Sequence, residues 1–67
     1  MNKNDECARV IAHFEKAIAN GELKNWRDCF YTAYGWLEAA GFDAVPFEII
    51  RWLDAAAAEG KINHTEY

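Results

Sequence analysis

Apolar residues recur at intervals of three and four in three separate runs of the chain. This is the period of an amphipathic α-helix, so the runs predict helices over about residues 5–19, 25–40 and 46–59. A glycine follows each run, and glycine is the usual residue for the left-handed turn that ends a helix. The sequence therefore predicts an all-α fold: one compact three-helix domain over residues 1–67, with a short extended C-terminal tail.

The predicted middle helix has its own start and stop signals. Asn25 can cap the first turn, and Asp28 follows at the position where a carboxylate can bond back. Residues with an apolar or small side chain gather on one side of this helix, with Tyr34 at the edge. These predicted core residues are Trp26, Cys29, Phe30, Ala33, Trp36, Leu37 and Ala40.

The opposite side of the middle helix carries Tyr31, Gly35 and Ala39 at four-residue steps. A glycine inside a helix costs around 1 kcal/mol relative to alanine, which indicates a packing reason for it. Three interpretations remain open. The third helix of this chain packs closely against Gly35, another molecule does, or the glycine is merely tolerated.

The segments outside the helices are short. Residues 1–4 form a polar lead-in, with Asn4 as the expected cap of the first helix. A connector of a few residues makes the first two helices an antiparallel hairpin. We expect Leu23 to be the buried anchor of this connector and Phe42 to be the buried anchor of the second connector. Pro46 suits the first turn of the third helix. In residues 61–67 we expect Ile62 to contact the core and the last residues to be extended or without fixed structure.

The third helix is apolar around more than half of its circumference, although packing on two neighbours requires a stripe of only somewhat over 100°. We expect the surplus to be covered by the first helix, by a second copy of the chain or by a partner. The apolar set is Phe47, Ile49, Ile50, Trp52, Leu53, Ala56 and Ala57.

Composition favours a folded but marginally stable domain, because 52% of the 67 residues are hydrophobic and 15% are aromatic. The net charge is −4, and residues 38–67 carry the whole excess, with Arg51 and Lys61 as their bases. Such a chain lacks a row of basic side chains to bind the phosphates of a nucleic acid, so direct nucleic-acid binding is not expected. The acids either bind a partner with a basic surface or simply keep the surface solvated. They are Glu38, Asp43, Glu48, Asp54, Glu59 and Glu66.

No apolar run approaches the ~20 residues that span a bilayer, and the N-terminal residues do not form a signal peptide. We therefore expect a cytoplasmic protein without membrane contact. Cys7 and Cys29 lie near the starts of antiparallel helices, roughly 20 Å apart, whereas a disulfide requires Cα atoms within about 7 Å. Both are expected to be reduced core thiols.

The sequence carries no motif for catalysis, metal binding or a cofactor. His13 and Cys29 could meet across the hairpin, but Cys29 lies on the core face and His13 most simply points to solvent. Zinc ligation by Cys7, Cys29, His13 and His64 lacks any paired ligand spacing. The carboxylates of Glu38 and Asp43 straddle a turn, with no buried neighbour to raise a pKa. We expect no enzyme, no metal and no cofactor.

Aromatic residues at the edges of the helix faces are the best candidates for contact with a partner. Trp26 is expected in the core, whereas Trp36 and Trp52 lie at the flanks of their faces, where they serve either as interface residues or as peripheral core. The leading hypothesis is a small non-enzymatic protein-protein interaction module, an adaptor or inhibitor, that acts through its aromatic flanks and acidic C-terminal half, alone or as a homodimer. Its candidate partner-binding residues are Tyr31, Gly35, Trp36, Glu38, Glu48, Trp52 and Glu59.

Two alternatives stay open. Three short helices followed by a tail fit a helix-turn-helix or winged-helix-like DNA-binding regulator, although the third helix offers Arg51 as its one basic residue. The acidic half could instead imitate DNA and inhibit a nucleic-acid-binding enzyme. In general character the short, acidic, aromatic-rich chain is similar to small regulatory and host-takeover proteins of phages and mobile elements, with no motif of a particular family.

Overall fold

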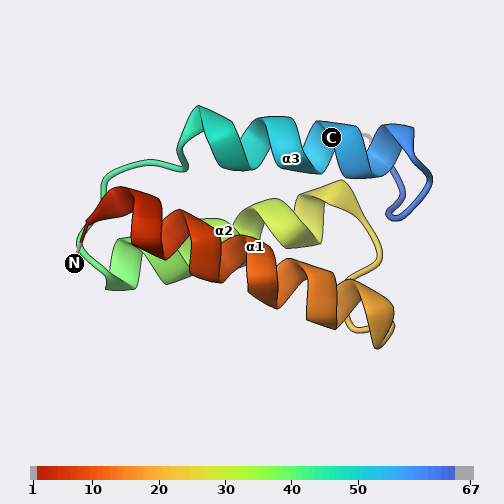
Figure 1. The fold of residues 1–67 in the computed structure, drawn as a ribbon, viewed down its shortest axis with the longest axis horizontal. Coiled ribbons are helices and arrows are strands. Elements are labelled where there is room, and N and C mark those ends of the chain that lie inside the picture. Colours follow the sequence, from red (N-terminus) through yellow and green to blue (C-terminus); the bar gives the residue numbers. More distant parts are fainter. Residues whose placement is uncertain (1, 65–67) are drawn as a thin grey trace.

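The computed structural model describes residues 2–64 and contains three helices packed side by side (Figure 1). They are α1 (Lys3–Ala19), α2 (Trp26–Ala39) and α3 (Phe47–Ala58). Successive helices run in opposite directions, so α1 and α3 are parallel to each other. The predicted all-α three-helix fold is confirmed. Within the described residues, no helix has both the length and the apolarity to cross a membrane.

The first helix begins two residues earlier than predicted, and its cap is Asn2 rather than Asn4. The Asn2 side chain accepts a hydrogen bond from the Asp5 N–H at 2.9 Å, and Asn4 lies within the first turn. Either asparagine could serve as a cap. Starting at Asn2 also places Asp5 and Glu6 in the first turn, where a carboxylate interacts favourably with the helix dipole.

The start of α2 follows the prediction. The Asn25 side chain accepts a hydrogen bond from the Asp28 N–H at 2.8 Å, and its amide donates to the Asp28 carboxylate at 3.2 Å. The start of α3 lies one residue later than predicted. Pro46 is the extended cap residue, with φ −63° and ψ 150°, so the first turn begins at Phe47.

Each helix ends in a Schellman motif, in which two backbone bonds close the last turn. After α2, the Phe42 N–H donates to the Leu37 carbonyl at 2.9 Å and the Gly41 N–H donates to the Glu38 carbonyl at 3.0 Å. Gly41 has φ 95°, a conformation that costs an L-residue energy because of its Cβ. The glycines after α1 and α3 make the equivalent bonds. All three predicted stops are confirmed.

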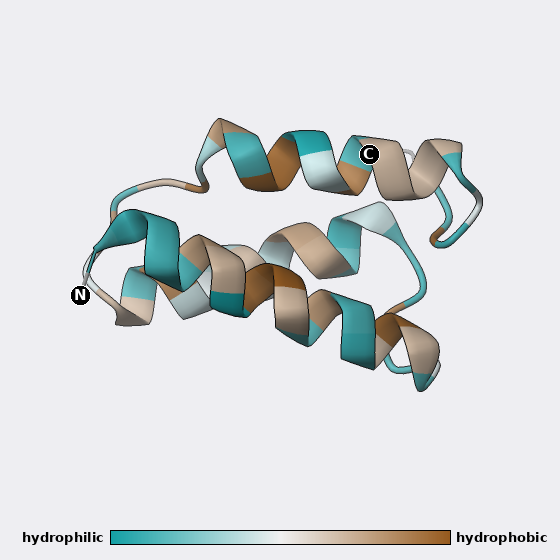
Figure 2. Ribbon diagram, in the orientation of Figure 1, coloured by the Kyte–Doolittle hydropathy of each residue, from teal (hydrophilic) through white to brown (hydrophobic). Residues whose placement is uncertain are grey.

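The apolar sides of the three helices meet in one core, and each helix alternates between hydrophilic and hydrophobic residues along its length (Figure 2). Trp26 is 9% exposed, which confirms its predicted place. Leu23 and Phe42 pack against the core from the connectors, also as predicted. The most deeply buried large side chains are Phe14, Leu37, Ile49, Leu53, Val10, Cys7 and Cys29.

The chain after α3 turns back to the start of α2. Ile62 is 4% exposed, which confirms it as a core contact. Asn63 then forms a parallel bridge with Asn25: its N–H donates to the Lys24 carbonyl, and its carbonyl accepts from the Trp26 N–H, both at 2.8 Å. The second bond satisfies an N–H that the first turn of a helix leaves free. The prediction for residues 65–67 lies outside the described residues.

The interpretation that Gly35 accommodates the third helix is wrong. A Cβ atom at Gly35 would meet nothing within 4 Å, and both Tyr31 and Ala39 are exposed. The reason is that α3 packs on the core side of α2, where the Trp26 indole reaches it. The back of α2 therefore faces open space within the described part of the chain.

Candidate functional site

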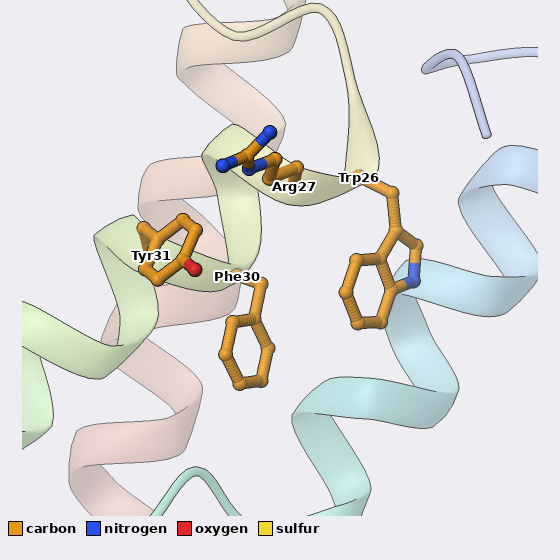
Figure 3. Close-up of a pocket in the computed structure, with 4 residues that line it drawn as sticks. All are labelled: Trp26, Arg27, Phe30 and Tyr31. Atoms are coloured by element: carbon orange, nitrogen blue, oxygen red, sulfur yellow. The ribbon is translucent and has the colours of Figure 1, made fainter. Parts of the chain in front are cut away.

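One flank of α2 carries a hollow of about 310 Å³ that is lined by Trp26, Arg27, Phe30 and Tyr31. We call this flank the α2 aromatic face; it consists of Arg27, Phe30, Tyr31 and Tyr34. Tyr31 is 59% exposed and Tyr34 is 43% exposed. Figure 3 shows the side chains that line the hollow: Arg27 extends toward Tyr31, while Trp26 and Phe30 lie on the other side.

The aromatic rings here are held in a fixed arrangement. Trp26 and Phe30 stack with ring centroids 5.3 Å apart and planes 6° apart, and Phe30 meets Tyr31 edge to face at 5.8 Å. The Trp26 indole N–H donates to the Asp54 carboxylate of α3 at 2.9 Å, which ties the cluster to the core. The Arg27 guanidinium lies 5.8 Å from the centre of the Tyr31 ring, within cation–π range. The rings of Trp26, Phe30 and Tyr31 therefore contact one another in sequence, and Arg27 lies near the last of them.

Three of the predicted partner-binding residues lie together on the exposed back of α2, and one of them, Tyr31, also belongs to the α2 aromatic face. Tyr31, Gly35 and Glu38 follow one another at spacings of four and three on α2, and all three are exposed. Because Gly35 has no side chain and Glu38 projects one turn beyond it, another chain can approach the α2 backbone closely between a tyrosine and a carboxylate.

Trp36 lies between α1 and α2, away from that surface. Its indole N–H donates to the Glu6 carboxylate at 3.1 Å, and its ring lies 5.6 Å from the His13 ring. His13 is therefore half-buried against Trp36, and the expectation that it simply points to solvent is wrong. Glu6 is 3% exposed and also accepts from Arg9 at 3.2 Å. Trp36 is a peripheral core residue with a buried hydrogen-bond partner.

Trp52 and Glu48 belong to a second surface, which we call the α1–α3 groove. One hollow of about 570 Å³ is lined by Ile11, Phe47, Glu48, Arg51 and Trp52. The next, of about 270 Å³, is lined by Glu15, Ile18, Ala19, Trp52 and Lys61. Phe47 is 69% exposed at one end of the groove, so α1 covers only part of the apolar surplus of α3.

Among residues 38–64, the acidic side chains do not gather on one face. Asp54 is occupied by the Trp26 indole, and Glu59 pairs with Lys61 at 3.2 Å near the end of α3. Glu38 lies on α2 and Glu48 in the α1–α3 groove. The predicted partner-binding residues are consequently divided among the back of α2, the α1–α2 interface, the groove and the end of α3.

The environment of Cys29 opposes thiolate chemistry. Cys29 is fully buried, and this burial, together with the nearby Asp28 carboxylate, raises the pKa of its thiol to about 11. Burial first, and the charge of Glu48 second, also raise the pKa of the Cys7 thiol. Both cysteines are free. Among residues 2–64 no group of three or more His, Cys, Asp or Glu side chains is placed to hold a metal ion.

Sequence reasoning missed several residues of these surfaces. The missed Arg27 and Tyr34 lie four residues before and three residues after the predicted Tyr31, and this spacing is a detectable signal for a shared helix flank. The pattern includes Phe47 in the apolar set of the third helix, but its side chain is 69% exposed beside the hollow that it lines with Ile11 of α1. Nothing in the sequence distinguishes Glu6, since an acid in a first turn is ordinarily a solvated partner of the helix dipole.

Comparison of the chain with protein families, with curated proteins and with solved structures finds no match.

Proposed function

We propose that this protein is a small non-enzymatic adaptor or inhibitor that binds a basic helical segment of another protein through the α2 aromatic face. The observation that carries the proposal is the pair of exposed tyrosines, Tyr31 and Tyr34; the Tyr31 ring contacts Phe30, which in turn stacks on Trp26. Rigid aromatic side chains supply large contact areas at low entropic cost, and they are enriched in binding hot spots.

The charges along α2 favour a particular kind of partner. Arg27, Tyr31, Tyr34 and Glu38 form a stripe at helical spacing about 16 Å long, with a base at its first end and an acid at its last. A partner helix with a Lys or Arg opposite Glu38 would complement this stripe, and Gly35 would allow its backbone to come close. The net charge of −4 would attract a basic protein at long range.

The two nucleic-acid alternatives receive less support from specific contacts. The one basic residue of α3, Arg51, lies 5.9 Å from the Phe47 ring, and the remaining charges of this helix are acidic. A DNA mimic requires a continuous acidic face, whereas Asp54 and Glu59 are both engaged within the molecule. Both alternatives remain outcomes of the experiments below.

The test is quantitative affinity capture from the lysate of the native host with three baits, followed by mass spectrometry after nuclease treatment. The baits are the wild type, a Tyr31→Ser/Tyr34→Ser variant and a Phe47→Ser variant. Phe47→Ser is the matched control because it removes an exposed aromatic ring from a different surface. We expect a protein that the wild type and the control retain and that the double variant loses.

The partner found in this way is then purified and its affinity measured by calorimetry. Glu38→Lys should weaken binding about tenfold or more, because it places like charges together at the end of the stripe. A captured protein that nuclease treatment alone removes from the bait would favour the DNA-binding regulator instead. So would tight, salt-sensitive binding of DNA in a gel shift. A partner held equally by all three baits would remove the α2 aromatic face from the proposal.

A further inference from the structure

The α1–α3 groove has an ordered arrangement of apolar and charged side chains. Trp52 lines both hollows and forms the boundary between them. Its ring lies 5.6 Å from the ring of the fully buried Phe14, so residues 14 and 52 lie at the same level along the parallel helices. Trp52 is half-buried, and it shares one hollow with Ile11 and the other with Ile18, so apolar side chains of α1 line both hollows.

The two rims of the groove carry opposite charges at this level. Arg51 on α3 lies one residue before Trp52, and Glu15 on α1 lies one residue after Phe14. Because Phe14 and Trp52 share a level, Arg51 and Glu15 are offset along the helix axes by about 3 Å. Lys61 adds a second base on the α3 side of the same hollow as Glu15. Its ion pair with Glu59 joins two side chains that are 58% and 59% exposed, and such a pair is weak enough to rearrange.

We propose that a second copy of this chain occupies the α1–α3 groove and forms a two-fold symmetric dimer. A two-fold axis that runs along the groove places the α1 rim of each copy against the α3 rim of the other. Each Arg51 then meets the partner copy's Glu15, and the two Trp52 rings meet on the axis. The groove balances two acids, Glu15 and Glu48, with two bases, which suits a copy of itself better than a strongly basic or acidic partner.

This dimer does not depend on the α2 aromatic face, which lies on another helix and stays exposed in each copy. A dimer would therefore present that face twice. A partner with two binding segments would gain affinity from such a pair without any new contact.

The test is a charge exchange across the groove, followed by sedimentation equilibrium from about 1 μM to 1 mM. We expect the wild type to form a reversible dimer of the 67-residue chain. Arg51→Glu and Glu15→Arg should each raise the dissociation constant about tenfold or more, because each creates two like-charge contacts per dimer. The double variant Glu15→Arg/Arg51→Glu restores both pairs and should return the constant to within about threefold of the wild type.

The matched control is Arg27→Glu, because Arg27 is also an exposed arginine beside an aromatic ring, at 5.8 Å from the Tyr31 ring centre. It should leave the dissociation constant unchanged. Circular dichroism establishes that each variant is folded, and these exposed positions are expected to tolerate the change. A monomer at 1 mM overturns the proposal. So does a dimer that the single variants leave intact, or one that the double variant fails to restore.

Discussion

Replacing Glu6 should destabilise this protein more than its position in the first turn of a helix suggests. The Glu6 carboxylate is 3% exposed, accepts the Trp36 indole N–H at 3.1 Å and pairs with Arg9 at 3.2 Å. Glu6→Ala removes both interactions and leaves the indole N–H without its acceptor. Glu6→Gln retains a side-chain oxygen that can accept from the indole, and Arg9→Ala removes the ion pair with Glu6 while leaving the indole bond in place.

The expected magnitudes follow from the exposure of each partner. A hydrogen bond to a charged group contributes about 1.5–3 kcal/mol, whereas an exposed ion pair contributes about 0–1 kcal/mol. The Arg9 side chain is 60% exposed, so the bond to Trp36 dominates. Replacing Glu6 also removes the desolvation cost of a buried carboxylate, and this gain offsets part of the lost unfolding free energy. We expect a decrease in unfolding free energy of about 2 kcal/mol for Glu6→Ala, about 1 kcal/mol for Glu6→Gln and about 0.5 kcal/mol for Arg9→Ala.

Urea unfolding followed by far-ultraviolet circular dichroism measures these differences. With a slope near 1 kcal/mol per molar urea for so small a domain, Glu6→Ala should lower the midpoint by about 2 M. The corresponding fall in Tm is about 8–16 °C. A double-mutant cycle with Trp36→Phe isolates the indole bond, because phenylalanine lacks the N–H. In the Trp36→Phe background, Glu6→Ala should cost about 1–2 kcal/mol less than in the wild type.

Two results would refute this reasoning. Equal stability of the wild type and Glu6→Ala would mean that burial of the carboxylate costs as much as its bonds contribute. An unchanged cost of Glu6→Ala in the Trp36→Phe background would mean that the indole bond is not the source of the stabilisation.

Substitutions at three further positions test other parts of the structure by the same unfolding measurement. Burial raises the pKa of the Cys29 thiol from 9.0 to about 11 in the folded protein. The protonated thiol therefore makes its full contribution to the free energy of unfolding below pH 9, and this contribution is lost as the pH rises from about 9 to 11. The stability difference between the wild type and Cys29→Ala should therefore shrink by about 2 kcal/mol over that range, and a constant difference would contradict the burial of the thiol. Gly35→Ala should stabilise the protein by about 0.5–1 kcal/mol, because the added methyl group meets nothing within 4 Å; destabilisation would mean that the back of α2 is covered. Asp54→Ala should cost about 1 kcal/mol through the lost bond to Trp26, whereas Asp54→Asn should retain most of the stability; equal losses would argue that the carboxylate charge matters more than the acceptor.

The helices and their ends are the part of this protein that the sequence determines by itself. Helix periodicity, caps and stops act between residues at most five positions apart, as the Asn25–Asp28 bond and the Schellman bonds at Gly41 illustrate. Local competition between similar signals explains the errors: Asn2 and Asn4 are both suitable caps, and the choice between them shifted the start of α1 by two residues.

The candidate surfaces were only partly predictable. The periodicity placed Tyr31 and Gly35 on the side of α2 away from the core, and both are exposed. The same periodicity left Trp36 and Trp52 with identical expectations, at the flanks of their helices. The structure separates them, since Trp36 bonds to the buried Glu6 and Trp52 borders the hollows of the α1–α3 groove.

Only the tertiary structure decided which flank of each helix is covered. The bonds from Trp36 to Glu6 and from Trp26 to Asp54 join residues 30 and 28 positions apart, and the Asn25–Asn63 bridge joins the start of α2 to the segment after α3. Such contacts depend on how the three helices are rotated against one another. That rotation is fixed by the fit of the whole core, so no single run of residues encodes it.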